Sequence, residues 1–212
     1  VGTVLASLAA DVMLSAATAP PDAVSPAGAT GSDGSATPFS LPPPPMCIIA
    51  GGETTVTLGA DAGVGGRNME CALATAAALA GGPASHLLAR YDVACVSFAT
   101  DGSDGPTDAA GAVVTPALLR RLRRSPSAES GDAVARALAR HDTYTLFRAA
   151  GAVWPLQLND SAASGAAAAA TGSAAAGLAA GGAGGEWCGG LITTGGTGTN
   201  VMDVVCVIVR PL

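Results

Sequence analysis

An apolar run that passes directly into an acidic, glycine-rich segment is the feature that most restricts the fold of this chain. Residues 93–99 have the composition of a buried strand, and residues 100–111 follow with three aspartates and three glycines. A short apolar run bounded by turn-forming residues indicates a strand inside a hydrophobic core. We therefore expect Asp101, Asp104 and Asp108 at the carboxyl end of this strand, where open α/β sheets bind ligands.

The acidic segment also has a purely structural interpretation. Asp-Gly and Gly-Pro pairs form turns, and Thr107 or Asp108 could cap a helix that begins at Ala109. Two further Gly-rich segments, residues 65–68 and 194–200, each adjoin a predicted helix or strand. Three such loops favour the functional interpretation, in which they bind one shared anionic ligand.

The hydrophobic pattern along the chain predicts an α/β domain. Val4, Leu8 and Val12 recur at helical spacing with Leu5 alongside, so we expect an amphipathic first helix that packs on a domain. The other predicted elements are strands at 47–50, 54–58, 93–99, 191–194 and 204–209, and helices at 68–80, 116–124, 132–140 and 141–150.

Two low-complexity segments limit the part of the chain that can pack. Residues 20–45 are rich in proline, which is typical of a linker, and 20 of the 25 residues 161–185 are alanine or glycine. Such a composition cannot form a core. We therefore predict a terminal helix (1–19), a Pro-rich linker (20–45), and a domain at 46–210 interrupted by a disordered insertion at 160–186.

Composition excludes several classes of function. All ten basic residues are arginine, and the absence of lysine excludes a P-loop with its phosphate-binding lysine and any lysine nucleophile in this chain. A net charge of −6 gives no support for nucleic-acid binding. No stretch offers the ~18 uninterrupted apolar residues of a membrane span. Neither nucleic acid nor a membrane is therefore expected as a partner.

The cysteines point to a reducing compartment. Cys47, Cys71, Cys95, Cys188 and Cys206 show no paired metal-ligand spacing. Three of them lie in apolar runs, where cysteine behaves as a small hydrophobic residue. An odd number in a chain that is not a short secreted scaffold argues against a disulfide framework. We therefore expect reduced thiols and a cytoplasmic location.

Five segments, taken together and in this order, resemble a known family. They are residues 51–56 (Gly-Gly-Glu-Thr-Thr-Val), 66–68 (Gly-Arg-Asn), the acidic segment 100–111, 142–144 (Asp-Thr-Tyr) and 197–203. The chain resembles the carboxy-terminal MOFRL domain of the glycerate 2-kinase family, over about residues 46–209 apart from the insertion. The resemblance implies a MOFRL-type α/β domain with a mixed sheet flanked by helices.

The resemblance also implies a function. The family phosphorylates D-glycerate with ATP, in a cleft between two α/β domains. The larger amino-terminal kinase domain, with its nucleotide-handling lysine, has no counterpart here, and residues 1–45 look like its last helix and the linker. We therefore expect a fragment of a glycerate kinase, with ATP and Mg²⁺ as cofactors and with D-glycerate and that kinase domain as partners.

The resemblance places the family's active-site arginine at Arg67. A guanidinium at a helix amino terminus can bind a carboxylate or phosphate through two hydrogen bonds and stabilise charge on a transferred phosphoryl group. Asn68 is expected to donate beside it. The alternative for Arg67 is a surface salt bridge.

Two further groups complete the predicted site. Asp101 and Asp104 are catalytic candidates that could position Mg²⁺ or orient the glycerate hydroxyl, with Asp108 as a binding residue, and the sequence does not divide these roles. The segment Thr197, Gly198, Thr199 and Asn200 offers N–H groups and hydroxyls to an anionic oxygen. Glu53 is expected to brace the loops or to bind ligand, and Asp203 to be a structural turn residue.

The sequence leaves alternatives open. The chain could be a glycerate kinase by itself, or a catalytically silent ligand-binding or assembly module that needs a separate kinase domain. An oxidoreductase would need a dinucleotide fingerprint, which Gly63, Gly65 and Gly66 do not supply. His141 stands where the family more often has asparagine, and it is interpreted as a solvated or capping residue. A homo-oligomer remains one of the open quaternary states.

Overall fold

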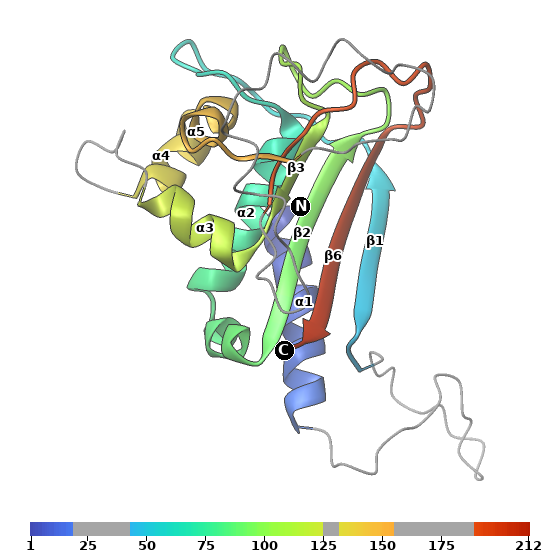
Figure 1. Ribbon diagram of the computed structural model, residues 1–212, viewed down its shortest axis with the longest axis vertical. Helices are drawn as coiled ribbons and strands as arrows, with labels where there is room; N and C mark the ends of the chain where they lie inside the picture. The colour runs from blue at the N-terminus through green and yellow to red at the C-terminus, as the bar shows by residue number, and fades with distance from the viewer. Residues whose placement is uncertain (19–42, 125–131, 155–188) are drawn as a thin grey trace, which may run out of the picture.

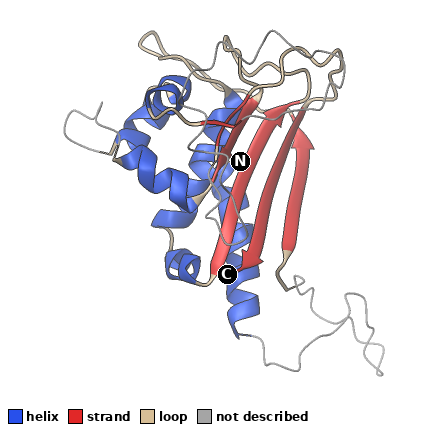
Figure 2. Ribbon diagram, in the orientation of Figure 1, coloured by secondary structure: helices blue, strands red, loops and turns tan. Residues whose placement is uncertain are grey.

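The described strands form one open sheet with a layer of helices on one face (Figures 1 and 2). The computed structural model describes residues 1–18, 43–124, 132–154 and 189–212. The sheet order is β1-β6-β2-β3-β5-β4, with β1 (Met46–Gly52), β2 (Tyr91–Ala99), β3 (Gly111–Val114), β4 (Val153–Trp154), β5 (Gly190–Ile192) and β6 (Asp203–Pro211). All neighbours pair antiparallel except β4 and β5, which are parallel. The predicted α/β class and mixed sheet are confirmed.

The helix layer consists of five α-helices and one 3-10 helix in the described part of the chain. They are α1 (Gly2–Thr18), α2 (Arg67–Gly81), η1 (Pro83–Ala89), α3 (Pro116–Arg123), α4 (Ala133–Ala139) and α5 (Thr143–Ala149). The predicted Pro-rich linker (apart from residues 43–45) and the predicted insertion at 160–186 lie outside the described residues.

Helix α2 lies at the centre of the core. Its buried residues Met69, Leu73, Ala76 and Leu79 recur every three to four positions and therefore form one stripe on the helix. That stripe packs on β2 and β3. Each fully buried leucine contributes about 2 kcal/mol relative to an exposed one. The prediction of a helix at 68–80 is confirmed.

The amino-terminal helix buries only part of the expected face. Leu5 and Val12 are buried as expected, together with Met13, whereas Val4 is 63% and Leu8 38% exposed. Helix α1 is apolar nearly all round, so periodicity could not identify the packed side. The helix packs on α2, with Gly2 so close that a Cβ there would lie 3.0 Å from Ala74 Cβ.

Several elements differ from the sequence prediction. Residues 54–58 form no strand, because β1 ends at Gly52, opposite Asp203, where its partner β6 begins. No helix begins at Ala109; residues 109–110 lead instead into β3. The 3-10 helix and the short strands β3 and β4 were not expected; the two strands, of four and two residues, are too short to show a periodicity.

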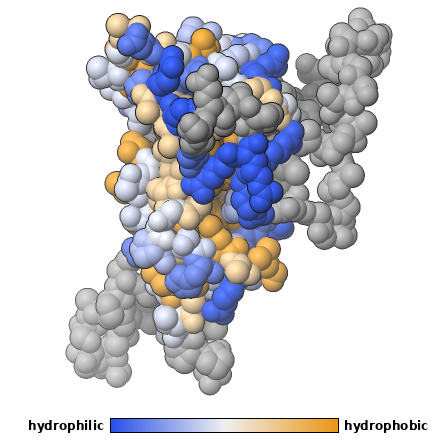
Figure 3. All heavy atoms as spheres, turned by 90° about the vertical axis from the view of Figure 1, so that its left-hand side faces the viewer, coloured by the Kyte–Doolittle hydropathy of each residue, from blue (hydrophilic) through white to orange (hydrophobic). Residues whose placement is uncertain are grey.

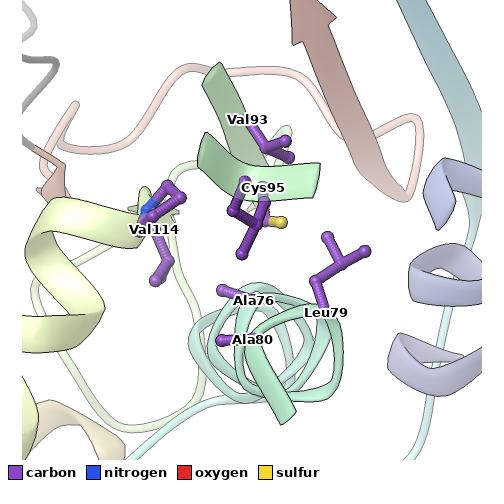
Figure 4. A pocket seen from close by; sticks show the side chains of 8 residues that line it. Ala76, Leu79, Ala80, Val93, Cys95 and Val114 are labelled. Atoms are coloured by element: carbon purple, nitrogen blue, oxygen red, sulfur yellow. The ribbon is translucent and has the colours of Figure 1, made fainter. Parts of the chain in front are cut away.

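A small apolar cavity of about 10 Å³ lies between α2 and the sheet. Ala76, Leu79 and Ala80 face Val93 and Cys95 across it (Figure 4). Alanine on α2 leaves this gap, because its single methyl group does not reach the strands. The cavity has room for about one water molecule and no polar lining to hold it.

The outer surface of the helix layer is largely hydrophilic (Figure 3). Three exposed arginines of α3, Arg120, Arg121 and Arg123, lie opposite its buried leucines. Within the described residues no single helix has the length and apolar character of a membrane span. Helices α2 and η1 reach that length and apolar character only when they are taken together, and the two are bent by 92° relative to each other.

Candidate functional site

Three loops meet at one end of the sheet (Figure 1). They comprise residues 53–66 after β1, residues 100–110 between β2 and β3, and residues 193–202 between β5 and β6. Strands β1, β2 and β5 end here, and β3 and β6 begin here, because their pairing is antiparallel. The loops therefore gather as the sequence predicts, although the sheet is not of the parallel type on which that expectation rested.

Asp104 binds the amino terminus of α2. Its side chain is fully buried, and its carboxylate accepts hydrogen bonds from the backbone N–H of Asn68 (3.0 Å) and Met69 (2.8 Å) and from Asn68 Nδ2 (3.4 Å). The helix has no cap of its own, since Gly66 stands at the N-cap position. A carboxylate there satisfies free N–H groups and meets the positive end of the helix dipole. The anion at this helix terminus is thus part of the protein.

Burial raises the pKa of Asp104, and this effect outweighs the hydrogen bonds from Asn68 and Met69 and the charge of Arg67, which lower it. The approach is so close that a Cβ on Gly66 would collide with the Asp104 carboxylate. In this structure Asp104 cannot ligate a cation from solvent, because its oxygens already accept protein donors and no part of its side chain is exposed.

Asn68 is buried with Asp104. Besides donating to that carboxylate, it accepts a hydrogen bond from Ser97 Oγ at 2.6 Å through its own Oδ1. Ser97 lies on β2, so the contact ties the start of α2 to the centre of the sheet. Asn68 therefore joins elements of the protein and does not face solvent in this structure.

Arg67 lies beside this buried cluster but faces outward. Its Nε and Nη2 donate to the two oxygens of Asp203 at 2.6 and 2.8 Å, and Nη2 lies 3.6 Å from Glu53 Oε1. The arginine side chain is 24% exposed, Glu53 58% and Asp203 3%. The hydrogen bond with Asp203 is the main reason that the pKa of Arg67 is raised. Arg67 Nη1 makes no hydrogen bond with any described residue.

The loop at 197–202 is fixed to the acidic loop. Thr197 Oγ1 donates to the backbone oxygen of Thr100 (2.5 Å), and the N–H of Thr197 donates to that of Asp101 (3.2 Å). Asn200 Nδ2 donates to Asp101 Oδ2 at 3.3 Å. The Asp101 carboxylate also accepts from Ser103 N–H. Residues 195–202 are exposed, so Gly198, Thr199 and their neighbours present backbone to solvent from a braced loop.

Asp108 contacts another part of the chain, the start of α5. It accepts a hydrogen bond from Tyr144 Oη at 2.6 Å, and this bond is the main reason that the pKa of Tyr144 is raised. The segment 142–144 in turn holds the loop before α2: Asp142 Oδ1 accepts from Val64 N–H, and Tyr144 N–H donates to the Val64 carbonyl.

His141 pairs with the first turn of α2. Its Nδ1 lies 2.9 Å from Glu70 Oε2, and its φ is +54°. Histidine, like asparagine, is among the residues enriched in this left-handed backbone conformation. The histidine therefore braces α5 against α2.

Three residues that take part in these hydrogen bonds were not predicted to do so. Asp203 was interpreted as a turn residue, yet it holds Arg67; Ser97 and Thr100 were assigned no role. A polar residue in an apolar run, as Ser97 is, could have indicated an internal hydrogen bond. The partner of Arg67 lies 136 residues away, and nothing local in the sequence indicates it.

The described residues contain no group of three or more His, Cys, Asp or Glu side chains that could hold a metal ion. Asp101 and Asp104, the expected Mg²⁺ ligands, point into different networks. These two carboxylates therefore do not share one cation site within the described residues.

The fold and the site define an α/β domain that presents a fixed arginine at the loop end of its sheet. A model described as the MOFRL family matches residues 46–203. The chain belongs to the MOFRL family.

Several of its relatives carry kinase names, and a relative from Agrobacterium vitis, 44% identical over 108 residues and covering 50% of this chain and 22% of that protein, is named putative hydroxypyruvate reductase. The chain is 39% identical over 167 residues to a glycerate kinase of Macaca fascicularis, covering 79% of this chain and 31% of that protein. It is 31% identical over 166 residues to a glycerate 2-kinase of Pyrococcus horikoshii, covering 78% and 26%. The crystal structure of a glycerate kinase of Thermotoga maritima superposes with a TM-score of 0.54 and 25% identity, covering 98% of this chain and 33% of that one. The chain thus spans about a third or less of these relatives.

Proposed function

We propose that this chain supplies one side of a glycerate kinase active site, at which ATP phosphorylates D-glycerate. Arg67 is the residue that would bind the glycerate carboxylate or the transferred phosphoryl group. The observation that carries the proposal is its placement: a partly exposed guanidinium, held in one orientation by Asp203, at the edge of three converging loops.

The pairing with Asp203 leaves Arg67 able to donate a hydrogen bond to a ligand. Asp203 binds Nε and Nη2, which leaves Nη1 as a donor for an anionic oxygen. Because Asp203 fixes the guanidinium before ligand arrives, less side-chain entropy is lost on binding. Asp203 would therefore act as a positioning residue. The exposed segment 197–200 adds N–H groups on the same end of the sheet.

Phosphoryl transfer depends mainly on positioning and on neutralising charge, and little on covalent chemistry by the protein. Arg67 and the 197–200 loop could supply both functions on the substrate side. ATP and Mg²⁺ are expected to be bound chiefly by the part of the relatives that this chain does not span. The proposed partner is accordingly an amino-terminal kinase domain.

A second candidate is a ligand-binding or assembly module that is silent without that domain. The absence of lysine and the occupation of the α2 terminus by Asp104 favour it, because neither a lysine nor the free N–H groups of that helix terminus is then available to a polyanionic nucleotide.

Calorimetric titration of the purified chain with D-glycerate and with ATP–Mg²⁺ tests the site. The parent is expected to bind D-glycerate, and Arg67→Ala to lose that binding. Arg140→Ala, which removes an exposed arginine outside the cluster, should bind like the parent. No binding by the parent, or equal loss in both variants, would contradict the proposed role of Arg67.

Formation of ADP in the same mixtures separates the two candidates. Turnover by the parent that is lost in Arg67→Ala would make the chain an enzyme by itself. D-glycerate binding without turnover would favour the module that depends on a partner.

A further inference from the structure

Two cysteines, Cys47 on β1 and Cys206 on β6, lie on the face of the sheet opposite the helix layer. On β6, Val205, Val207 and Val209 are buried against the helices, so the alternate residues Cys206 and Ile208 point to the other side. Cys47 and Ile49 on β1 are exposed, Ile49 at 69%. Solvent therefore reaches this part of the sheet, which lies at its edge.

The strand register places the two thiols next to each other. Cys47 pairs with Ile208, and Ile49 pairs with Cys206. Opposite residues of an antiparallel pair share a face, so Cys47 and Cys206 are diagonal neighbours on one face, and their side chains are close enough to interact.

The pKa of Cys206 reflects the nearby Cys47 thiol. Burial raises its pKa, and the charge and hydrogen-bonding contact of Cys47 raise it further. The other two described cysteines differ: Cys71 and Cys95 are buried in the helix-side core, where burial raises the pKa of Cys95 to about 12. Only the β1–β6 pair, among the described cysteines, combines exposure with a neighbouring thiol.

We propose that Cys47 and Cys206 form a paired-thiol modification site that undergoes exchange with low-molecular-weight disulfides. The thiolate of Cys47, the more exposed of the two, attacks one sulfur of the small disulfide, forms a mixed disulfide and releases one small thiol. The thiolate of Cys206 then attacks the Cys47 sulfur and releases the second. The two protein thiols are oxidised to one disulfide, and the small disulfide is reduced to two thiols.

The position at the sheet edge makes the bond feasible but strained. Diagonal Cβ atoms in such a pair lie somewhat less than about 7 Å apart, whereas a relaxed disulfide needs about 3.8 Å. Strand β1 has a neighbour on one side only among the described strands, so it can shift toward β6. An exposed, strained disulfide is easily reduced. The bond would join the two strands that lead to Glu53 and Asp203, the partners of Arg67.

The test is exposure of the native Cys188→Ser chain to oxidised glutathione, followed by alkylation of the remaining thiols and mass spectrometry. Cys188 is replaced because it lies outside the described residues. The expected product has lost two hydrogens and two alkylation sites and contains a peptide in which Cys47 and Cys206 are linked. Dithiothreitol should restore both thiols. Cys71 and Cys95 should stay unmodified in the folded chain.

Two serine variants make the result decisive. In Cys206→Ser, Cys47 should keep one glutathione, because no second thiol displaces it; in Cys47→Ser no linked peptide should form. Cys95→Ala, in the core, should leave the linkage unchanged when the chain remains folded by circular dichroism. A glutathione that persists on Cys47 when both cysteines are present, or no reaction at either, would overturn the proposal.

Discussion

Two neighbouring residues of α2 belong to two different polar clusters. Asn68 belongs to the buried cluster, which also contains Asp104 and Ser97 and in which the Asp104 carboxylate meets only protein donors. Arg67 belongs to the open cluster, with Asp203 and Glu53, and its guanidinium remains partly exposed.

The difference between the clusters separates stability from ligand binding. A buried charge must have all its partners inside the protein, because each unmet group costs about 1–3 kcal/mol. A partly exposed charge can leave a donor to water, and that donor is then available to a ligand. The buried cluster is therefore expected to fix the loops, and the open cluster to be the part that binds.

The largest expected effect is that of Asp104→Ala. The change leaves the N–H groups of Asn68 and Met69 buried without an acceptor, so the free energy of unfolding should fall by about 3 kcal/mol. The free energy of unfolding is measured by urea denaturation, with circular dichroism as the signal. Asp61→Ala, at an exposed loop position, should change stability by less than about 0.5 kcal/mol. Similar values for both variants would refute the distinction between the clusters.

Gly66→Ala should be the next most severe change. A methyl group there would collide with the Asp104 carboxylate, and relief of the overlap would displace the cap of α2, at a cost of about 2 kcal/mol. The same denaturation experiment applies, with Gly59→Ala as the matched control, since a Cβ at Gly59 meets nothing within 4 Å. Equal stability of the two variants would show that the loop moves aside freely.

Arg67→Ala should cost less, about 1 kcal/mol, because the partly exposed arginine covers Asp203 and its removal lets water reach the Asp203 carboxylate, which is 3% exposed in the parent, and replace the lost hydrogen bonds. Its effect on D-glycerate binding should be larger than its effect on stability. D-glycerate binding and the free energy of unfolding should be measured on one preparation, so that the two effects of the substitution can be set side by side. A stability loss as great as that of Asp104→Ala would place Arg67 among the structural residues.

The last expected effect concerns pH. Because the pKa of Asp104 is raised on folding, the folded chain holds its proton more tightly than the unfolded chain. The stability that this gives is complete below the unfolded-state pKa and is lost as the pH rises through the folded-state pKa. The stability of the parent minus that of Asp104→Asn should therefore fall as the pH is raised over this window. A difference that rises with pH would mean that the hydrogen bonds outweigh burial.

Long periodic elements and the loop chemistry were predictable from the sequence. Helix α2, strands β2 and β6, and the positions of three Gly-rich loops along the chain follow from hydrophobic spacing and from glycine positions. That the loops meet at one end of the sheet depends on the antiparallel pairing, which the sequence did not indicate. The buried face of α1 was not predictable, because alanines and leucines surround that helix. Nor were β3 and β4, whose formation depends on their neighbours.

The sequence alone determined which residues are charged, which loops are flexible enough to turn, and that Arg67 begins a helix. Tertiary structure decided which charge is buried and which is presented. Asp101 and Asp104 are three residues apart and alike in sequence context, yet Asp104 caps α2 while Asp101 binds the 197–200 loop. A side chain's environment depends on residues from distant parts of the chain, and Asp203 reaches Arg67 only because β6 pairs between β1 and β2.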